Sequence, residues 1–467
     1  MKIVAFSINP IFPDTITGGA SKHLFHIARF LGEQGHDVEI LCATGDAGGA
    51  SFDWAENVHV FPILPFHLPF PQPYAISGAD LGLIVERVSR HLRDADRFYI
   101  HDGEFLVPDV YAHIPTVTSF RDNIYPESVL GTFIGKADEV ICISEFSAEV
   151  IKATAGRFFP GLLDRMHLVK NGIDFKVFKP APVDALASRL GVDPQEHLIV
   201  LHPHRPEPGK GLPETIRVVD QLVHRHGLHQ VRVLIPEWIE TMVSTGEASF
   251  YQQMTDLMDT LGVREHFIFI PWLPQEHMPA LYSLGHVTLC LGNFVETFGN
   301  VAYESLACGT PSVVAKVGVH RTLLPDELID KVDYGDIEGA VDRVLAILAG
   351  KRANQPEVLA YLKANLDYQR QLLSYAEVIT RCEKREPLLF SPPLTDSNQY
   401  YRLAPWCYVT DERIYHDFRG EYIHDQDLIE ILTNNPVFSR ADADLRHFLD
   451  AQWEAWLGDT LIVPVES

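Results

Sequence analysis

The chain has 467 residues, 46% of which are apolar, and a formal net charge of −25. A chain of this length is too long for a single hydrophobic core, so we expect two or three globular domains. The acidic charge argues against nucleic acid and anionic lipid as partners, because both would be repelled.

No stretch is apolar over the roughly 18 residues that a transmembrane helix needs, so we expect no stable membrane insertion. The apolar run in residues 1–10 is too short for a secretory signal, and we expect a cytoplasmic protein. The cysteines show no paired spacing typical of disulfides or zinc sites, which indicates reduced packing residues. They are Cys42, Cys142, Cys290, Cys308, Cys382 and Cys407.

The first third of the chain alternates short β-branched runs with amphipathic helical segments. The strand-like runs are KIVAFSI, DVEILCA, VHVFPIL, RFYIH, TVTSF and EVICIS, and the first helix passes through HLFHIARFLGEQ. This alternation is typical of a mostly parallel sheet with helical crossovers. We predict a doubly wound, Rossmann-like α/β domain over residues 1–178, followed by a linker near 175–195 where glycine and prolines interrupt the pattern.

The same alternation returns in HLIVLHP, VRVLIP, HFIFIP, HVTLCLG and SVVAKV, with helices between them. It predicts a second Rossmann-like domain over residues 190–355. Two such domains facing one another form a cleft, with ligands at the carboxyl ends of the strands. Residues 356–386 have a helical pattern.

Residues 387–467 form an acidic extension rich in aromatic residues, which is a small third domain, a lid or an arm for homo-oligomer formation. Ser439 and Asp442 have the spacing of a capping box. They predict a final helix over ADADLRHFLDAQWEAWL.

The stretch ETFGNVAYESLACGTP places Glu296 in a loop and Glu304 within a predicted helix, Phe298–Cys308. Gly299 and Asn300 fall in the first helical turn, where free backbone N–H groups attract phosphate. Carboxylates beside such a site suit sugar and ribose hydroxyls, because each can accept two hydrogen bonds. The alternative is that Glu296 stabilises the helix dipole and Glu304 points to solvent.

A second loop, HPHRPEPGKG, places Arg205 and Lys210 between a strand and a helix. The arginine guanidinium can donate two parallel hydrogen bonds to diphosphate oxygens, and the lysine ammonium is a compact positive charge. Together they would neutralise the negative charge on a phosphate that leaves during a reaction. The alternative is two solvated loop cations. Gly18 and Gly19, between the first strand and first helix, would let a phosphate approach the backbone or would simply form a tight turn.

Together these motifs resemble retaining glycosyltransferases of the GT-B fold, specifically glycosyltransferase family 4 (group 1). The E-x7-E pattern matches Glu296 and Glu304, and HRPEPGKG is similar to the family's G-R-x4-K-G. VKNGIDFKVFKP is similar to N-G-V-D-x3-F-x-P, and FIFIPWLPQEHMPALYSLGHVTLCLG resembles the F-x-G-x-V…L-Y strand pair. The resemblance covers residues 1 to about 385.

The resemblance implies roles for individual residues. Arg205 and Lys210 would hold the donor diphosphate, Glu304 the ribose and Glu296 the donor sugar. His101 would lie beneath that sugar. The remaining implied donor-site residues are Gly18, Gly19, Trp272, Leu273, Phe298, Gly299, Asn300 and Val301, and those implied on the acceptor side are Asp122 and Asn123.

Two positions and one segment depart from the family pattern. Pro271 replaces a glycine and His286 an aspartate, and GVHRTLLPDE stands where the family has Gly-Gly-x-x-E, so the sugar contacts there are expected to differ.

The family's front-face displacement, in which the leaving phosphate takes the acceptor proton, implies a UDP- or GDP-sugar co-substrate without a required cofactor or metal. The triplets Asp94–Asp96 and Asp442–Asp444 would support a metal-dependent alternative.

The acceptor is expected to be a small polar or cationic molecule or a peptide, because the N-terminal third is acidic. Two other functions remain open at this point: a nucleotide-sugar epimerase of the same fold, and a noncatalytic scaffold that binds through its extension.

Overall fold

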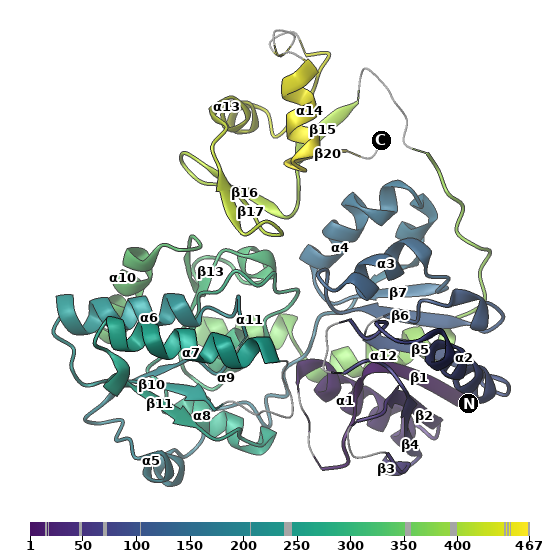
Figure 1. The fold of residues 1–467 in the computed structure, drawn as a ribbon, viewed down its shortest axis with the longest axis horizontal. Coiled ribbons are helices and arrows are strands. Elements are labelled where there is room, and N and C mark those ends of the chain that lie inside the picture. The colour runs from purple at the N-terminus through teal and green to yellow at the C-terminus, as the bar shows by residue number, and fades with distance from the viewer. Residues whose placement is uncertain are drawn as a thin grey trace.

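The computed structural model contains two α/β domains and a C-terminal extension (Figure 1). It describes residues 1–467 apart from 15, 17, 46–48, 69–71, 103, 206, 238–244, 351–355, 393–398, 443–444, 446–447, 449, 466–467 and the side chains of 245–248. The predicted GT-B-like fold class, with two Rossmann-like domains and an appendage, is confirmed.

The N-terminal domain is built on an eight-stranded sheet in the order β3-β4-β2-β1-β5-β6-β7-β8. Only β3 is antiparallel to its neighbour. The strands are β1 Lys2–Pro10, β2 Asp37–Ala43, β3 Phe52–Ala55, β4 Val58–Leu64, β5 Arg97–Asp102, β6 Thr116–Phe120, β7 Glu139–Cys142 and β8 Met166–Leu168. The helices that pack on them are α1 Gly19–Glu33, α2 Gly78–Leu92, α3 Pro126–Ile134 and α4 Glu145–Ala153.

The second domain is built on a parallel six-stranded sheet in the order β11-β10-β9-β12-β13-β14. Its strands are β9 Leu198–Leu201, β10 Val231–Pro236, β11 Phe267–Ile270, β12 Val287–Cys290, β13 Ser312–Ala315 and β14 Asp330–Val332. Its helices are α5 Asp184–Leu190, α6 Leu212–Asp220, α7 Thr245–Thr260, α8 Met278–Leu284, α9 Asn300–Ala307, α10 Ile337–Leu348 and α11 Pro356–Asn365.

Each sheet has one place where the chain reverses the direction in which it adds strands. In the N-terminal sheet this switch point lies between β1 and β5, and in the second sheet between β9 and β12. Connections on the two sides of a switch point run to opposite faces of the sheet, so the loops at the strands' carboxyl ends diverge and leave room for a ligand. The two Gly-containing loops and the E-x7-E segment all begin at these switch points.

The last helix before the extension, α12 Tyr368–Arg381, returns to the N-terminal domain (Figure 1). Its buried Tyr375 hydroxyl lies 3.1 Å from Ser119 Oγ on β6 and accepts from Arg121 at 3.2 Å. The helix packs on α1, β5 and β6, so the N-terminal core includes a segment from beyond the second domain.

The extension contains two small antiparallel sheets, β19-β15-β20 and β16-β17-β18. Its elements are β15 Tyr400–Leu403, β16 Cys407–Val409, β17 Ile414–His416, β18 Glu421–Ile423, α13 Gln426–Asn434, β19 Val437–Ser439, α14 Asp450–Gly458 and β20 Ile462–Pro464. Its tryptophans Trp406, Trp453 and Trp456 are buried in one apolar cluster with residues of both larger domains. The extension is therefore packed against the rest of the chain.

The predicted final helix over residues 441–457 is wrong at its start, because α14 begins at Asp450. Ser439 and Asp442 do contact each other, since the Ser439 N–H donates to Asp442 Oδ2 at 2.8 Å. Residues 443, 444, 446, 447 and 449 of the predicted helix lie outside the described residues.

The described helices include none that is both long and apolar enough to cross a bilayer. All six cysteines are buried and unpaired, as predicted.

Candidate functional site

The loops that follow β9 and β12 meet at the switch point of the second sheet. Lys210 Nζ lies 2.7 Å from Glu296 Oε1, and the same ammonium stands 3.4 Å from the centre of the Phe294 ring. The two loops touch because Gly292 has no side chain: a Cβ there would lie 1.9 Å from the Gly209 carbonyl oxygen. Residues far apart in sequence thus form one charged pair.

The Glu296 carboxyl is held in its ionised form. Burial acts to raise its pKa, but Lys210 outweighs burial and leaves the pKa below the usual value. His204 and His320 lie close enough to interact with this pair, and burial lowers the pKa of each to about 4. At neutral pH the cluster therefore consists of one cation, one anion and two uncharged imidazoles.

The helix that follows Glu296 begins later than predicted. The expected start at Phe298 is wrong: α9 starts at Asn300, and Gly299 before it has a left-handed φ of 72°. A Cβ at Gly299 would meet the His320 ring at 2.3 Å, so only glycine fits at this helix start. Phe298 is buried with its ring against Tyr303, and Val301 is half-buried in the first turn. The first-turn N–H groups lack intrahelical partners.

Glu304 points towards the N-terminal domain. Its carboxylate pairs with Lys22 of α1 and accepts a hydrogen bond from the Tyr282 hydroxyl at 3.0 Å. Only 9% of the Glu304 side chain and 11% of the Lys22 side chain are exposed, so the alternative that Glu304 points to solvent is wrong. Sequence reasoning missed Lys22, although it lies three residues after the predicted Gly-Gly turn.

Further contacts join the two switch points. A Cβ on Gly19 would lie 2.9 Å from Asn300 Nδ2, so the Gly18–Gly19 turn rests against the first residue of α9. Asn171 Nδ2 approaches Asn300 Oδ1 at 3.5 Å. Thr297 Oγ1 donates to the Arg121 carbonyl at 2.5 Å. The E-x7-E segment is therefore in direct contact with the N-terminal domain.

Arg205 is the more accessible of the two predicted cations. Half of its side chain is exposed, and its guanidinium pairs with Glu207 at 3.0 Å. Burial raises the pKa of Tyr125 to about 12, and the nearby Arg205 acts in the opposite direction. Tyr125 belongs to the N-terminal domain, so Arg205 lies near the boundary between the two domains. Trp272 and Leu273 follow β11 at the same edge of the second sheet.

His101 does not present its ring to the space between the domains. The imidazole is fully buried: Nε2 lies 2.9 Å from the Ala20 carbonyl oxygen and Nδ1 lies 2.6 Å from the Tyr99 hydroxyl. Since a carbonyl only accepts, Nε2 carries the proton and Nδ1 accepts from tyrosine. Burial keeps the pKa well below the usual value, so the ring is neutral and both nitrogens are engaged.

The predicted acceptor-side residues differ in availability. Asp122 accepts from the Ile124 N–H at 3.0 Å, the Tyr125 N–H at 2.9 Å and Ser128 Oγ at 2.7 Å, so its carboxylate organises the start of α3. Asn123 is buried, and its amide nitrogen has no hydrogen-bond partner among the described residues. Of the two side chains, Asn123 is the one with a free donor.

The described residues contain no group of three or more His, Cys, Asp or Glu side chains arranged to hold a metal ion. In the first D-x-D triplet, Asp94 accepts a hydrogen bond from the Lys2 ammonium and Asp96 accepts one from the Lys2 backbone N–H. In the second triplet Asp444 lies outside the described residues.

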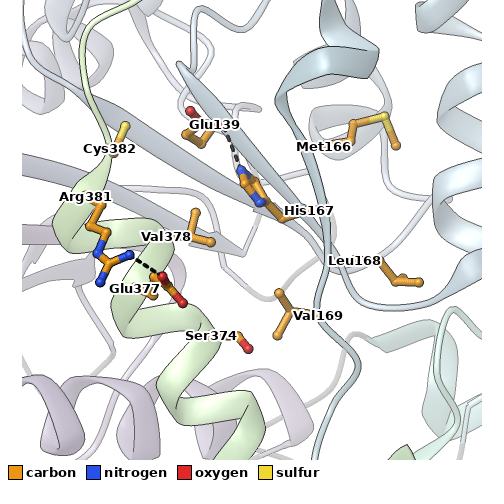
Figure 2. Close-up of a pocket in the computed structure, with 10 residues that line it drawn as sticks. All are labelled: Glu139, Met166, His167, Leu168, Val169, Ser374, Glu377, Val378, Arg381 and Cys382. Carbon is orange, nitrogen blue, oxygen red and sulfur yellow. Dashed lines mark hydrogen bonds and ion pairs between the residues drawn. The ribbon is translucent and has the colours of Figure 1, made fainter.

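A separate hollow of about 580 Å³ lies between β8 and α12, on the N-terminal domain (Figure 2). Its charged groups are paired: His167 Nε2 lies 2.7 Å from Glu139 Oε2, and Arg381 contacts Glu377 at 2.5 Å. None of the predicted site residues lines it.

Comparison with known families divides the chain where the structure does. Residues 17–177 match the family described as Glycosyltransferase Family 4, and residues 191–358 match Glycosyl transferases group 1. The chain belongs to the group 1 glycosyltransferases. The predicted family resemblance is confirmed.

This group 1 glycosyltransferase is 31% identical over 187 residues to a D-inositol 3-phosphate glycosyltransferase of Acidothermus cellulolyticus, covering 39% of this chain and 41% of that protein. A protein of the same name from a Mycobacterium species is 29% identical over 259 residues, which cover 54% and 55% of the two chains. The match therefore spans about half the length of these curated relatives.

Solved structures support the fold. A sucrose-phosphate synthase from Thermosynechococcus elongatus superposes with a TM-score of 0.68 at 17% identity, covering 81% of this chain and 98% of that one. HepE of Anabaena, crystallised with UDP and glucose, gives a TM-score of 0.64 at 20% identity, covering 81% and 99%.

Proposed function

We propose that this protein is a retaining, metal-independent transferase that moves a hexosyl unit from a nucleoside-diphosphate sugar to a small hydroxylated acceptor. The observation that carries the proposal is the contact between the two switch points, where the Lys210–Glu296 pair and the start of α9 face the N-terminal domain. Ligands of doubly wound sheets bind at such points.

On the donor side, Lys210 and the half-exposed Arg205 are proposed to hold the diphosphate. Lys210 is already fixed by Glu296 and by the Phe294 ring, so little side-chain entropy is lost when it binds an anion. Glu296 stays ionised and would accept hydrogen bonds from sugar hydroxyls. The first-turn N–H groups of α9 would receive a phosphate or sugar oxygen.

Glu304 is proposed to bind the ribose hydroxyls, with Tyr282 fixing one carboxylate oxygen. Lys22 holds the other oxygen in the structure, so nucleotide entry would require the lysine to share or release it. For His101 the geometry favours a supporting role, because its ring holds Ala20 next to the Gly18–Gly19 turn.

The proposed reaction exchanges two bonds at the sugar's anomeric carbon. The bond to the leaving diphosphate oxygen breaks, and a bond to the acceptor oxygen forms on the same face. The acceptor proton passes to the leaving phosphate oxygen. Two cations neutralise the charge that develops there, so the protein contributes mainly positioning and electrostatic stabilisation.

Substrate classes are proposed from the relatives' names. HepE was crystallised with UDP and glucose, which favours a UDP-sugar donor. The inositol 3-phosphate glycosyltransferases favour a phosphorylated polyol acceptor over a cationic one.

Incubation with a panel of UDP- and GDP-sugars, with and without inositol phosphates and EDTA, tests the function. A transferase releases nucleotide and forms a glycoside whose anomeric configuration, measured by NMR, matches that of the donor. Interconversion of sugars without nucleotide release would instead show an epimerase. Binding without any turnover would show a scaffold, and loss of activity in EDTA would refute metal independence.

A further inference from the structure

The C-terminal extension reaches the donor-side loops through one buried ion pair. Asp417 follows β17, and its side chain is fully buried. Both of its carboxylate oxygens accept from Arg321, each at 2.7 Å, and Oδ2 also accepts from the Gly318 N–H at 3.3 Å. Arg321 and Gly318 belong to the short 3₁₀ helix Gly318–Arg321, which follows β13.

This short helix lies directly behind Glu296. The Val319 N–H donates to the Glu296 carbonyl at 2.9 Å. Gly318 has a φ of 55°, and a Cβ there would lie 2.4 Å from the same carbonyl oxygen. His320 packs against Gly299 and lies 2.9 Å from the Tyr303 hydroxyl. The helix therefore fixes both the Glu296 backbone and the start of α9.

A second contact from the extension reaches the same loop. A Cβ on Gly420 would lie 3.0 Å from Asn293 Nδ2, so the turn after β17 touches the segment that leads to Glu296. Arg321 also donates to the Pro405 carbonyl at 2.9 Å, and its guanidinium lies 5.5 Å from the centre of the Phe146 ring on α4. Arg321 thus contacts the extension and the N-terminal domain as well as its own domain.

We propose that the extension is an integral part of the donor site, and that Asp417 is a positioning residue for Glu296, acting through Arg321 and Gly318. This inference rests on the proposed function, in which Glu296 contacts the donor sugar. The inference gives residues 399–465 a role in donor binding. It also explains why the chain has GVHR at residues 318–321, since these residues contact both Asp417 and Glu296. A bidentate guanidinium–carboxylate pair fixes orientation as well as distance, which suits this task.

Two variants separate positioning from simple stabilisation. Asp417→Asn keeps the shape but removes the charge. Arg321→Met/Asp417→Leu replaces the buried pair with apolar side chains, a change that often preserves stability. Asp138→Asn is the matched control, because Asp138 is equally buried and accepts from Lys384 at 2.9 Å at the start of β7, within the N-terminal domain.

With UDP-glucose as the probe, both Asp417 variants are expected to lose about tenfold or more in donor kcat/KM, because small misplacements of a reacting group are costly. Affinity for UDP, which lacks the sugar that Glu296 is proposed to contact, is expected to fall by a smaller factor than donor kcat/KM. Asp138→Asn should lower the melting temperature and leave donor kcat/KM unchanged. Parent-like kcat/KM in the folded double variant would overturn the inference.

Hydrogen exchange gives a readout that does not need turnover. The peptide covering residues 293–304 should exchange faster in both Asp417 variants and at the parent rate in Asp138→Asn. Unchanged exchange would refute the positioning role even in an active enzyme, whereas failure of the parent to use any nucleotide sugar would refute the proposed function. Failure of both Asp417 variants to fold would show that the pair serves folding, and would also overturn the inference.

Discussion

Replacement of Lys210 by methionine is the most direct test of the donor-site geometry. The ammonium makes a charge-assisted hydrogen bond to Glu296 at 2.7 Å, and only 11% of the lysine side chain is exposed. A hydrogen bond from such a charged group to a ligand phosphate contributes about 1.5–3 kcal/mol. Lys210→Met is therefore expected to weaken UDP binding about 10- to 100-fold.

The same change alters Glu296. Its pKa is lowered because Lys210 outweighs burial, so without the lysine the pKa is expected to rise above the usual value. The free energy of unfolding should fall, because a buried carboxylate loses its partner. In Lys210→Met/Glu296→Gln the uncompensated charge is gone, so stability is expected to recover while UDP affinity remains low.

Isothermal titration calorimetry with UDP and with uridine measures the effect, since uridine lacks the diphosphate and should bind the parent and variant alike. Lys316→Met is the control: Lys316 pairs with Asp333 at 2.9 Å in the same domain and is more exposed. UDP affinity within about threefold of the parent in Lys210→Met would refute the assignment of Lys210 to the diphosphate.

Three further predictions concern Glu304, Arg205 and Glu104. Glu304→Gln is expected to weaken UDP binding about tenfold, because a carboxylate binds hydroxyls more strongly than an amide does. Binding of 2′,3′-dideoxy-UDP, which lacks the ribose hydroxyls, should change little. Equal losses of affinity for the two ligands in calorimetry would contradict the ribose assignment. Arg205→Ala should weaken UDP binding. It should lower the melting temperature by less than about 2 °C, because half of the side chain is exposed. A large fall in melting temperature without loss of UDP affinity would show that Arg205 serves stability instead of binding. Burial raises the pKa of Glu104 from 4.5 to about 7. The contribution of the protonated carboxyl to the free energy of unfolding is therefore complete below pH 4.5 and is lost as the pH rises through 7. In urea unfolding, Glu104→Gln should reduce this pH-dependent loss of unfolding free energy by up to about 3 kcal/mol. The same dependence of unfolding free energy on pH in the parent and the variant would disprove the effect.

The order of strand-like and helical segments along the sequence predicted most of the fold. The alternation of β-branched runs with amphipathic helices gave the two sheets, because strands buried on both faces need continuous apolar segments and parallel strands need crossovers. The extension was not predictable in the same way. Its strands are mostly three residues long, and so short a run carries too little periodic signal.

The start of α9 shows where local patterns fail. Phe298 has the apolar character of a helix residue, but His320 fills the space beside Gly299 and the chain turns into the helix only at Asn300. For His101, the family resemblance implied a ring beneath the donor sugar, whereas packing turned the ring onto Ala20 and Tyr99. In each case a tertiary neighbour decided the geometry.

The two α/β domains could be predicted from the order of residues alone, as could the family and the two loops with their cations and carboxylates. Local spacing was enough for these, since a loop between a parallel strand and the next helix must lie at the strand's carboxyl end. The folded chain was needed to show that Lys22 pairs with Glu304, 282 residues away, and that Asp417 pairs with Arg321, 96 residues away. Such pairs form only when separate domains dock, and no local pattern records which surfaces will meet.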